Sequence, residues 1–309
     1  MKQQSWTAEQ IPDQTGRVFV VTGATSGLGL AATRALARRN GQVILAVRDE
    51  EKGHRTVADL TAQHPAARLE VRRLDLADLD SVRTFAARLH GDLPRLDVLV
   101  NNAGVMAPPR TLTAQGHELQ FAANHLGHFA LTGLLLELLA AGHDPRVVTV
   151  SSLNHRQGRI VFDDLTGARG YKPMAYYNQS KLANAVFGWE LHRRLTSAGS
   201  PLRSLLSHPG YTATNLQMRA IGLPRLLFGI IARPLAQTPD QGALPLLYAS
   251  TAPGIEGGAF IGPDGKGELR GFPTRVALSA GATDTETGRR LWELSEQLTG
   301  VRYALPATA

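Results

Sequence analysis

The sequence contains no cysteine, so disulfide bonds, thiolate nucleophiles and cysteine-based zinc sites are excluded. Aromatic residues are also scarce, with nine Phe and six Tyr, which leaves little for stacking on nucleic-acid bases. No apolar run approaches the roughly 18 residues that a membrane-spanning helix needs. The longest candidate, residues 221–235, is interrupted by two prolines and two arginines. We therefore expect neither thiol chemistry nor a membrane span.

A signal peptide is not apparent either. The first 16 residues, MKQQSWTAEQIPDQTG, are polar and lack the apolar core that such a peptide has. The absence of cysteine is compatible with a reducing cytosol. The sequence therefore predicts a cytoplasmic protein without a membrane anchor.

The net charge of +7 raises the question of a nucleic-acid partner. However, the arginines are scattered through predicted helices and form no basic block, so no nucleic-acid partner is expected. We interpret the excess as mostly solvated helix faces, with an anionic ligand as a further use. Apolar residues make up 43% of the 309 positions, enough for a large core, and no repeat or linker divides the chain. We expect a single domain over residues 1–309.

Short apolar, β-branched runs alternate with helical stretches along the chain. This alternation predicts an α/β protein with a single-domain Rossmann fold, a doubly wound parallel sheet of seven strands and helices on both faces. One long helix is expected over residues 118–139. The predicted strands are Arg17–Thr22, Gln42–Val47, Arg68–Leu74, Leu96–Val100, Arg146–Val150, Leu202–Leu206 and Gly258–Gly262.

A glycine-rich turn, Gly23-Ala-Thr-Ser-Gly27-Leu-Gly29, lies between the first strand and a predicted helix. Glycines let a backbone approach a pyrophosphate closely, and the helix N-terminus offers N–H groups to it. The spacing Gly-x-x-x-Gly-x-Gly differs from the Gly-x-Gly-x-x-Gly of most dehydrogenases. The context nevertheless predicts a dinucleotide site.

The second strand ends at Arg48, where NAD-binding folds generally place an acid that holds the ribose 2′-hydroxyl. An arginine instead accommodates a 2′-phosphate, which favours NADP(H). Asp49 follows directly and keeps NAD(H) open. In the alternative interpretation, Arg48 is only a surface residue at the end of a strand.

Several polar or small residues follow predicted strands directly, among them Gly23, Arg48, Asp75, Asn102 and Ser152. The carboxyl ends of parallel strands meet at one edge of a sheet, and ligands bind there. This shared edge predicts one composite site.

Tyr177 and Lys181 lie four residues apart in a predicted helix and would share one face. A tyrosine hydroxyl has a pKa of about 10, and an ammonium group beside it favours the phenolate. Such a pair is common on surface helices, so its meaning depends on its neighbours. His125 and His128 have the spacing of a metal pair, but no acid or third ligand accompanies them, and no metal is expected.

Six motifs in order resemble the classical subgroup of the short-chain dehydrogenase/reductase family. They are Thr22-Gly-x-x-x-Gly27-x-Gly29, Asn101-Asn-Ala-Gly104, Asn124, Ser152, Tyr177-x-x-x-Lys181 and Pro209-Gly210. Three further stretches, and the 25-residue spacing from Ser152 to Tyr177, are similar to the retinol dehydrogenase and WW-domain oxidoreductase branch. Those stretches are Val43–Arg48, Asn124–Phe129 and Ser180–Asn184.

The resemblance implies a catalytic role for each of four residues. Tyr177 would be the general acid in carbonyl reduction and the base in alcohol oxidation. Ser152 would hydrogen-bond the substrate oxygen, as an oxyanion donor does. Lys181 would lower the Tyr177 pKa and hold the nicotinamide ribose, and Asn124 would position a water molecule for proton relay.

The resemblance also implies a binding site for NADP(H), or less favourably NAD(H). Arg48 would meet the 2′-phosphate, Asp75 the adenine, and Thr212 or Thr214 the carboxamide. The full set is Gly23, Thr25, Ser26, Gly27, Leu28, Gly29, Arg48, Asp75, Leu76, Asn102, Ala103, Gly104, Tyr177, Lys181, Pro209, Gly210, Thr212 and Thr214.

Together these features predict an oxidoreductase that transfers a hydride between NADP(H) and a hydrophobic ketone, aldehyde or alcohol. Residues 211–238 are apolar and broken by prolines, which fits a substrate lid, core packing or a subunit contact. A homodimer or homotetramer is compatible with the family's usual helix contacts. The alternative function is an NADP(H)-binding regulator or sensor without turnover.

Overall fold

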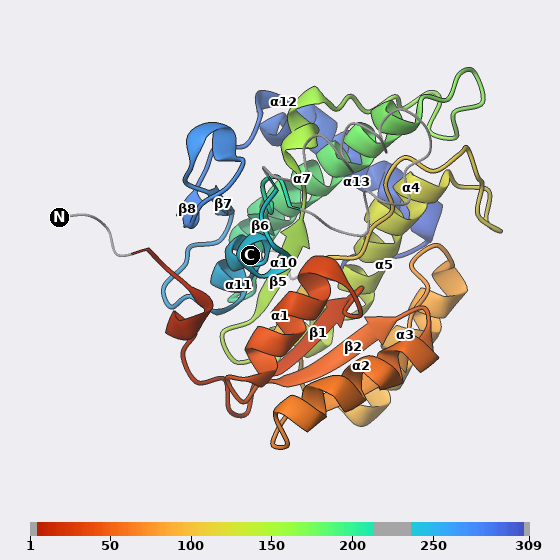
Figure 1. Cartoon of the computed structure of the whole chain (residues 1–309). Helices are drawn as coiled ribbons and strands as arrows, with labels where there is room; N and C mark the ends of the chain where they lie inside the picture. The colour runs from red at the N-terminus through yellow and green to blue at the C-terminus, as the bar shows by residue number, and fades with distance from the viewer. Residues whose placement is uncertain (1–4, 213–235, 306–309) are drawn as a thin grey trace.

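The computed structural model describes residues 5–212 and 236–305, and an eight-stranded sheet forms its middle layer (Figure 1). The strand order is β3-β2-β1-β4-β5-β6-β7-β8. Strands β1 to β7 are parallel, and β8 pairs with β7 in the antiparallel direction. The strands are β1 Val18–Thr22, β2 Gln42–Val47, β3 Arg68–Arg73, β4 Val98–Asn101, β5 Arg146–Val150, β6 Arg203–Ser207, β7 Phe260–Pro263 and β8 Pro273–Arg275.

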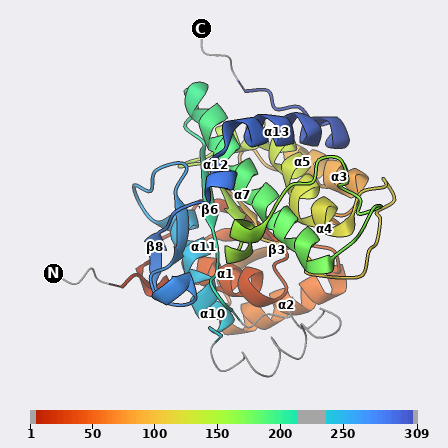
Figure 2. The same cartoon turned by 90° about the horizontal axis from the view of Figure 1, so that it is seen from above.

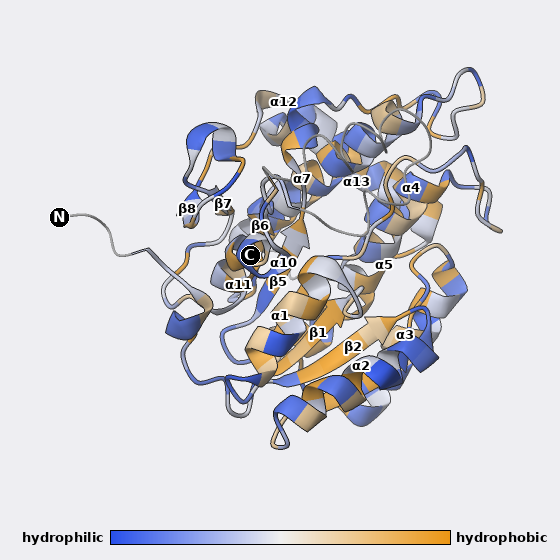
Figure 3. Cartoon of the chain, in the orientation of Figure 1, coloured by the Kyte–Doolittle hydropathy of each residue, from blue (hydrophilic) through white to orange (hydrophobic). Residues whose placement is uncertain are grey.

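The predicted parallel sheet is confirmed, with its seven strands at β1 to β7. The eighth strand was not predicted, because its three residues, Pro-Thr-Arg, carry no apolar pattern. All five residues of β1 and of β5 are buried, as expected for central strands covered on both faces. Strand β2 is buried except at Gln42, and Figure 3 shows that β1 and β2 are both apolar along their length.

Helices cover both faces of the sheet (Figures 1 and 2). Alternate residues of β1 face opposite cores: Val18 and Val20 pack with α3, α5, α7 and α13, whereas Phe19 and Val21 pack with α1 and α11. The helices are α1 Gly27–Ala37, α2 Glu50–Gln63, α3 Leu79–Asp92, α4 Leu119–Phe121, α5 Gly127–Leu134, α6 Leu136–Ala140, α7 Pro173–Ser197, α10 Pro239–Gly242, α11 Leu244–Thr251, α12 Ala280–Thr283 and α13 Thr285–Thr299.

The helix predicted over 118–139 is not continuous. A π-helical turn, Ala122–Leu126, separates α4 from α5, and α6 follows after a further break. At the end of this turn, a Cβ on Gly127 would lie 2.3 Å from the carbonyl oxygen of Leu76. The chain therefore runs directly against the loop after β3, which only glycine permits. Such π turns often mark functional sites, and this one contains Asn124.

The helix predicted around Tyr177 and Lys181 is confirmed as α7, which has 25 residues and begins with Pro173 at its first position. It contacts α4, α12 and α13 as well as β6. Most of its residues from Tyr176 to Leu191 are buried, so its sequence shows no clean polar face.

Residues 213–235, which hold Thr214 and most of the predicted lid over 211–238, lie outside the described residues. At the margins of that segment, Thr212 and Gln237 form an isolated parallel bridge. Among the described residues, no helix combines the length and the apolar character needed to cross a membrane.

Candidate active site at the carboxyl edge of the sheet

The residues predicted to form a site follow six neighbouring strands at one edge of the sheet. Gly23 follows β1, Asn102 follows β4 and Ser152 follows β5. The strand order reverses between β1 and β4, because β2 and β3 lie on one side of β1 and β4 to β7 on the other. Ligands bind open α/β sheets at such a switch point.

The glycine turn after β1 has the geometry of a phosphate cradle. Gly23 has φ +68° and Gly27 has φ +53°, in the left-handed region that favours glycine. A Cβ on Gly29 would lie 2.4 Å from the oxygen of Gly23 and 2.6 Å from Nδ2 of Asn102. Ser26 is the N-cap of α1, yet its side chain makes no capping hydrogen bond. The N–H groups of the first turn can thus receive an anion, which fits a pyrophosphate.

Thr22 connects this turn to the loop after β4. Its Oγ1 lies 2.9 Å from the backbone nitrogens of both Asn102 and Ala103. The side chain of Asn102 donates in turn to the carbonyl of Thr22 at 2.8 Å. The Asn102 amide therefore braces β1 against β4 beside the glycine turn.

Arg48 and Asp49 have different environments at the end of β2. Asp49 is the N-cap of α2, and its carboxylate accepts a hydrogen bond from the backbone nitrogen of Lys52 at 2.9 Å. Arg48 is exposed, and within the described chain its guanidinium has no hydrogen bond or ion pair. One oxygen of Asp49 is thus engaged in capping, whereas the whole guanidinium of Arg48 is available to a ligand at this strand end.

Asp75 and Leu76 follow β3 in a tight turn. One carboxylate oxygen of Asp75 accepts from the backbone nitrogen of Ala77 at 3.0 Å, and its own backbone nitrogen donates to Ser81 Oγ at 3.0 Å. The second carboxylate oxygen of Asp75 is not used in this turn, so the side chain can still accept a hydrogen bond.

Tyr177 and Lys181 share one face of α7, with the Lys181 Nζ 5.9 Å from the centre of the Tyr177 ring. Both side chains are buried, at 6% and 4% exposure. The Nζ of Lys181 donates to the carbonyl of Val150 at the end of β5. Ser151 Oγ donates to the carbonyl of Lys181, whereas the hydroxyl of Ser152 neighbours that of Tyr177.

Burial dominates the electrostatics of this pair. It raises the pKa of Tyr177 to about 12, against the lowering effect of the neighbouring Ser152 hydroxyl. Burial also lowers the pKa of Lys181 to about 8. Loss of solvent around the phenolate thus sets the direction of the Tyr177 pKa, and the lowering by Lys181 that the resemblance implies stays a prediction.

Asn124 joins three parts of the site. Its Nδ2 donates to the carbonyl of Val105 and to Ser180 Oγ at 3.0 and 2.8 Å, while its Oδ1 accepts from the Val105 nitrogen. A Cβ on Gly104 would lie 3.1 Å from Asn124 Oδ1 and 3.7 Å from Lys181 Nζ. The side chain of Asn124 thus holds the loop after β4 against α7, and its main-chain carbonyl lies 2.9 Å from Nδ1 of His128.

The loop after β6, which holds Pro209, Gly210 and Thr212, forms the last wall of the candidate site. Gly210 has φ +64°, and a Cβ there would lie 2.4 Å from the carbonyl oxygen of Leu269. Thr212 is buried, and its hydroxyl donates to the carbonyl of Pro209 at 2.8 Å. In the described structure this hydroxyl is thus used to close the loop.

Two histidines that sequence reasoning did not select support these walls. His155 Nδ1 lies 2.6 Å from the carbonyl of Ser152. His208 Nε2 lies 2.9 Å from Glu268 Oε2, and its Nδ1 lies 3.2 Å from the nitrogen of Gly210. The position of His208 directly before Pro209-Gly210 was a usable signal, whereas Glu268 lies 60 residues further along and gave none.

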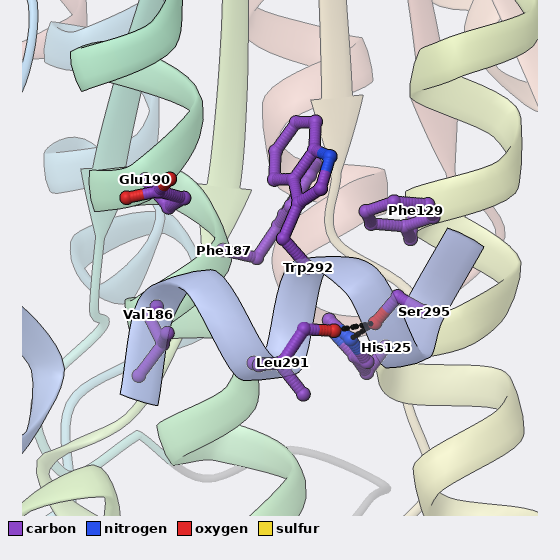
Figure 4. A pocket seen from close by; sticks show the side chains of 9 residues that line it. His125, Phe129, Val186, Phe187, Glu190, Leu291, Trp292 and Ser295 are labelled. Atoms are coloured by element: carbon purple, nitrogen blue, oxygen red, sulfur yellow. Dashed lines mark hydrogen bonds between the residues drawn. The ribbon is translucent and has the colours of Figure 1, made fainter. Parts of the chain in front are cut away.

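The cleft in Figure 4 belongs to the core. His125 Nε2 there lies 2.8 Å from Ser295 Oγ on α13, among the rings of Phe129, Phe187 and Trp292. Burial lowers the His125 pKa to about 3. Over residues 5–212 and 236–305, no cluster of three or more His, Asp or Glu side chains could hold a metal ion.

The sheet order, the glycine turn and the switch point define a dinucleotide-binding α/β protein. A family model described as short chain dehydrogenase matches residues 17–221, and the chain belongs to that family. It is therefore an oxidoreductase of a family that uses nicotinamide cofactors and acts on CH–OH or C=O groups of small molecules.

Relatives agree with the predicted branch. The chain is 40% identical to mouse (Mus musculus) polyprenol dehydrogenase over 296 residues, covering 94% of this chain and 86% of the relative. It is 40% identical to human (Homo sapiens) retinol dehydrogenase 13 over 292 residues, covering 93% and 85%. The resemblance to the retinol dehydrogenase branch is thus confirmed.

Solved structures show the same fold. An uncharacterized protein from Mycobacterium paratuberculosis is 45% identical with a TM-score of 0.81, covering 98% of this chain and all of its own. A short chain dehydrogenase from Shigella flexneri 2a in complex with NADP is 25% identical with a TM-score of 0.65, covering 81% and 98%.

Proposed function

We propose that this protein is an NADP(H)-dependent oxidoreductase that interconverts a hydrophobic ketone or aldehyde and the corresponding alcohol. The observation that carries the proposal is the convergence of Ser152, Tyr177 and Lys181 beside the glycine turn after β1. Tyr177 and Lys181, which can exchange protons, thus lie at the edge where a dinucleotide would bind. The Ser152 hydroxyl lies there too, as a hydrogen-bond donor.

Tyr177 is the proton donor in reduction. When bound, the nicotinamide supplies the hydride that adds to the carbonyl carbon. The Tyr177 hydroxyl gives its proton to the carbonyl oxygen, and Ser152 donates a hydrogen bond to the same oxygen as negative charge develops. With a pKa raised to about 12, the hydroxyl stays protonated at neutral pH, as the acid in reduction must be.

Lys181 and Asn124 support this proton donor. The Lys181 pKa of about 8 leaves the group mostly protonated at pH 7, yet able to exchange a proton near neutrality. Asn124 fixes the segment that faces Lys181, and its main-chain carbonyl, which already accepts from His128, has a second lone pair for a relay water. Both side chains also border the position proposed for the nicotinamide ribose.

Arg48 selects NADP(H) by pairing with the 2′-phosphate. The capping role of Asp49 supports this choice, because one of its carboxylate oxygens is engaged by the Lys52 nitrogen while the Arg48 guanidinium has no protein partner in the described chain. The similar proteins from Shigella flexneri and Escherichia coli, crystallised with NADP and NADPH, point the same way. The same proposal includes the other predicted contacts with the cofactor. They are made by the glycine turn, Asp75, Leu76, the turn after β4, Pro209, Gly210, Thr212 and Thr214.

The substrate is a bulky apolar carbonyl or alcohol. The relatives named for polyprenol and retinol support this class. A single domain, a cytoplasmic location, a lid over 211–238 and a homodimer or homotetramer stay predictions.

A panel of aldehydes and ketones of graded size, followed by NADPH oxidation, tests the proposal. Turnover should rise with apolar bulk and be faster with NADPH than with NADH. A protein that binds NADPH and reduces no member of the panel would instead support the regulator or sensor alternative.

A further inference from the structure

We propose that His128 is a positioning residue of this site, whose imidazole ties the main-chain carbonyl of Asn124 to the hydroxyl of Thr22. The inference rests on the proposed function, since Asn124 matters only if the site turns over. In this proposal one buried side chain holds the π turn at a fixed position relative to the glycine turn.

The geometry fixes the imidazole from both ends. His128 is the second residue of α5 and is 1% exposed. Its Nδ1 lies 2.9 Å from the carbonyl oxygen of Asn124, and its Nε2 lies 3.0 Å from Oγ1 of Thr22. Both ring nitrogens therefore have a partner, and each partner belongs to a different wall of the site.

The direction of these hydrogen bonds follows from their chemistry. A carbonyl oxygen can only accept, so Nδ1 must carry the hydrogen. Burial lowers the pKa of His128 to about 4, and the charge of Lys181 acts the same way, so the ring is neutral and Nε2 has no hydrogen. Nε2 must then accept from the hydroxyl of Thr22, which lies 3.0 Å from Nε2 and 3.2 Å from its other acceptor, the carbonyl of Val100.

Thr22 extends the chain to the loop after β4. With its hydrogen given to His128, its oxygen accepts from the backbone nitrogens of Asn102 and Ala103, each 2.9 Å away. All donors then point in one direction, from these two N–H groups through Thr22 and His128 to Asn124. Hydrogen bonds aligned in this way strengthen one another.

This carbonyl lies within the π turn, where a side-chain donor adds to the backbone hydrogen bonds. The N–H of Gly127 donates to the carbonyl of Ala122, five residues earlier, so the regular helical pairing is shifted here. His128 provides a donor for the carbonyl of Asn124, whose side chain meanwhile holds Ser180, next to Lys181. The chain of hydrogen bonds thus spans from the glycine turn to the helix of Tyr177 and Lys181.

Imidazole ¹⁵N NMR of the intact protein tests the hydrogen-bond chain without any activity measurement. The signal of His128 is assigned among the ten histidines by its loss in His128→Gln. We expect a neutral ring with hydrogen on Nδ1 throughout pH 5.5 to 8.5, with His125 and Lys181 as its titratable neighbours. Hydrogen on Nε2, or titration near the ordinary pKa of about 6.5, would overturn the inference.

Variants test the positioning role. His128→Phe and Thr22→Val each break the chain with a side chain of similar shape, and each should lower kcat about tenfold or more, because small misplacements are costly. The double variant should be no more than about threefold worse than the slower single one. His128→Gln, whose amide can donate and accept, should recover kcat to within about threefold of the native value.

His125→Phe is the matched control. His125 is equally buried, lies three residues earlier and pairs with Ser295 on α13 (Figure 4). It should lower the melting temperature while leaving kcat within about twofold. If His128→Phe behaves like this control, or if the effects of His128→Phe and Thr22→Val multiply, the positioning role is wrong.

The two proposals fail in different ways. A native protein that turns over no carbonyl contradicts the proposed function, whereas the NMR result still decides the hydrogen-bond chain. Turnover in a protein whose His128 carries its hydrogen on Nε2 contradicts only the inference about His128.

Discussion

Replacing Arg48 by alanine should weaken the binding of NADPH far more than that of NADH. The guanidinium is exposed at the end of β2, and in the described chain no protein group competes for it. A hydrogen bond to a charged partner contributes about 1.5–3 kcal/mol, and each 1.4 kcal/mol is a tenfold change in Kd. Because the site is open to solvent and salt, the lower half of that range applies, which corresponds to a loss of affinity of about 10- to 40-fold.

The assay is a fluorescence titration of both cofactors at low and moderate salt. Arg55→Ala is the matched control. Arg55 is an exposed arginine on the adjacent α2, so its replacement removes the same charge as Arg48→Ala does. It should change the Kd of either cofactor by less than about twofold. An equal loss of NADPH and NADH affinity in Arg48→Ala would refute the contact with the 2′-phosphate.

Three further predictions concern the glycine turn, a helix cap and the buried lysine. Gly29→Ala should abolish the rise in melting temperature that NADP⁺ causes, because its Cβ would lie 2.4 Å from the Gly23 oxygen; an unchanged rise would count against the cradle. Asp49→Ala should lower the free energy of unfolding by about 1 kcal/mol through loss of the α2 cap, as urea denaturation would measure; no loss would argue against that cap. The Lys181 pKa of about 8 lies below its unfolded value, so between pH 8 and 10 the unfolded chain binds more protons and stability rises with pH. Relative to Lys181→Met, the native protein should gain about 2 kcal/mol over that interval in urea denaturation, and parallel profiles would contradict this.

The middle of the sheet could be predicted because its central strands are buried on both faces. Runs such as Val18–Thr22 and Arg146–Val150 are short, apolar and β-branched, and each was located to within about a residue. The placement of Gly23, Asn102 and Ser152 at one edge then followed from parallel connectivity alone.

The π turn in the helix over 118–139 could not be predicted, and neither could the close packing of Gly127 at its end. The close approach of Gly127 to the loop after β3 depends on the packing of segments 51 residues apart. Sequence periodicity reports only which residues are apolar, and the residues of this stretch stay buried whether the turn is α or π.

The electrostatics of the catalytic pair also required the fold. Spacing along the chain placed Lys181 beside Tyr177 but gave no measure of how deeply both are buried. That burial sets the direction of the Tyr177 pKa. The contact between His128 and Thr22 also required the fold, because the two residues lie 106 positions apart in the sequence. The contact with Asn124 is local, four residues away.

Single-turnover reduction by Tyr177→Phe, measured beside NADPH binding, tests the central claim most directly. The substitution removes only the hydroxyl and its proton from a buried ring. We predict an unchanged Kd for NADPH and a rate of carbonyl reduction that falls by about 10²–10⁴-fold, the usual contribution of a positioned acid. A variant that reduces the substrate at a rate close to the native one would contradict the role of Tyr177 as the proton donor.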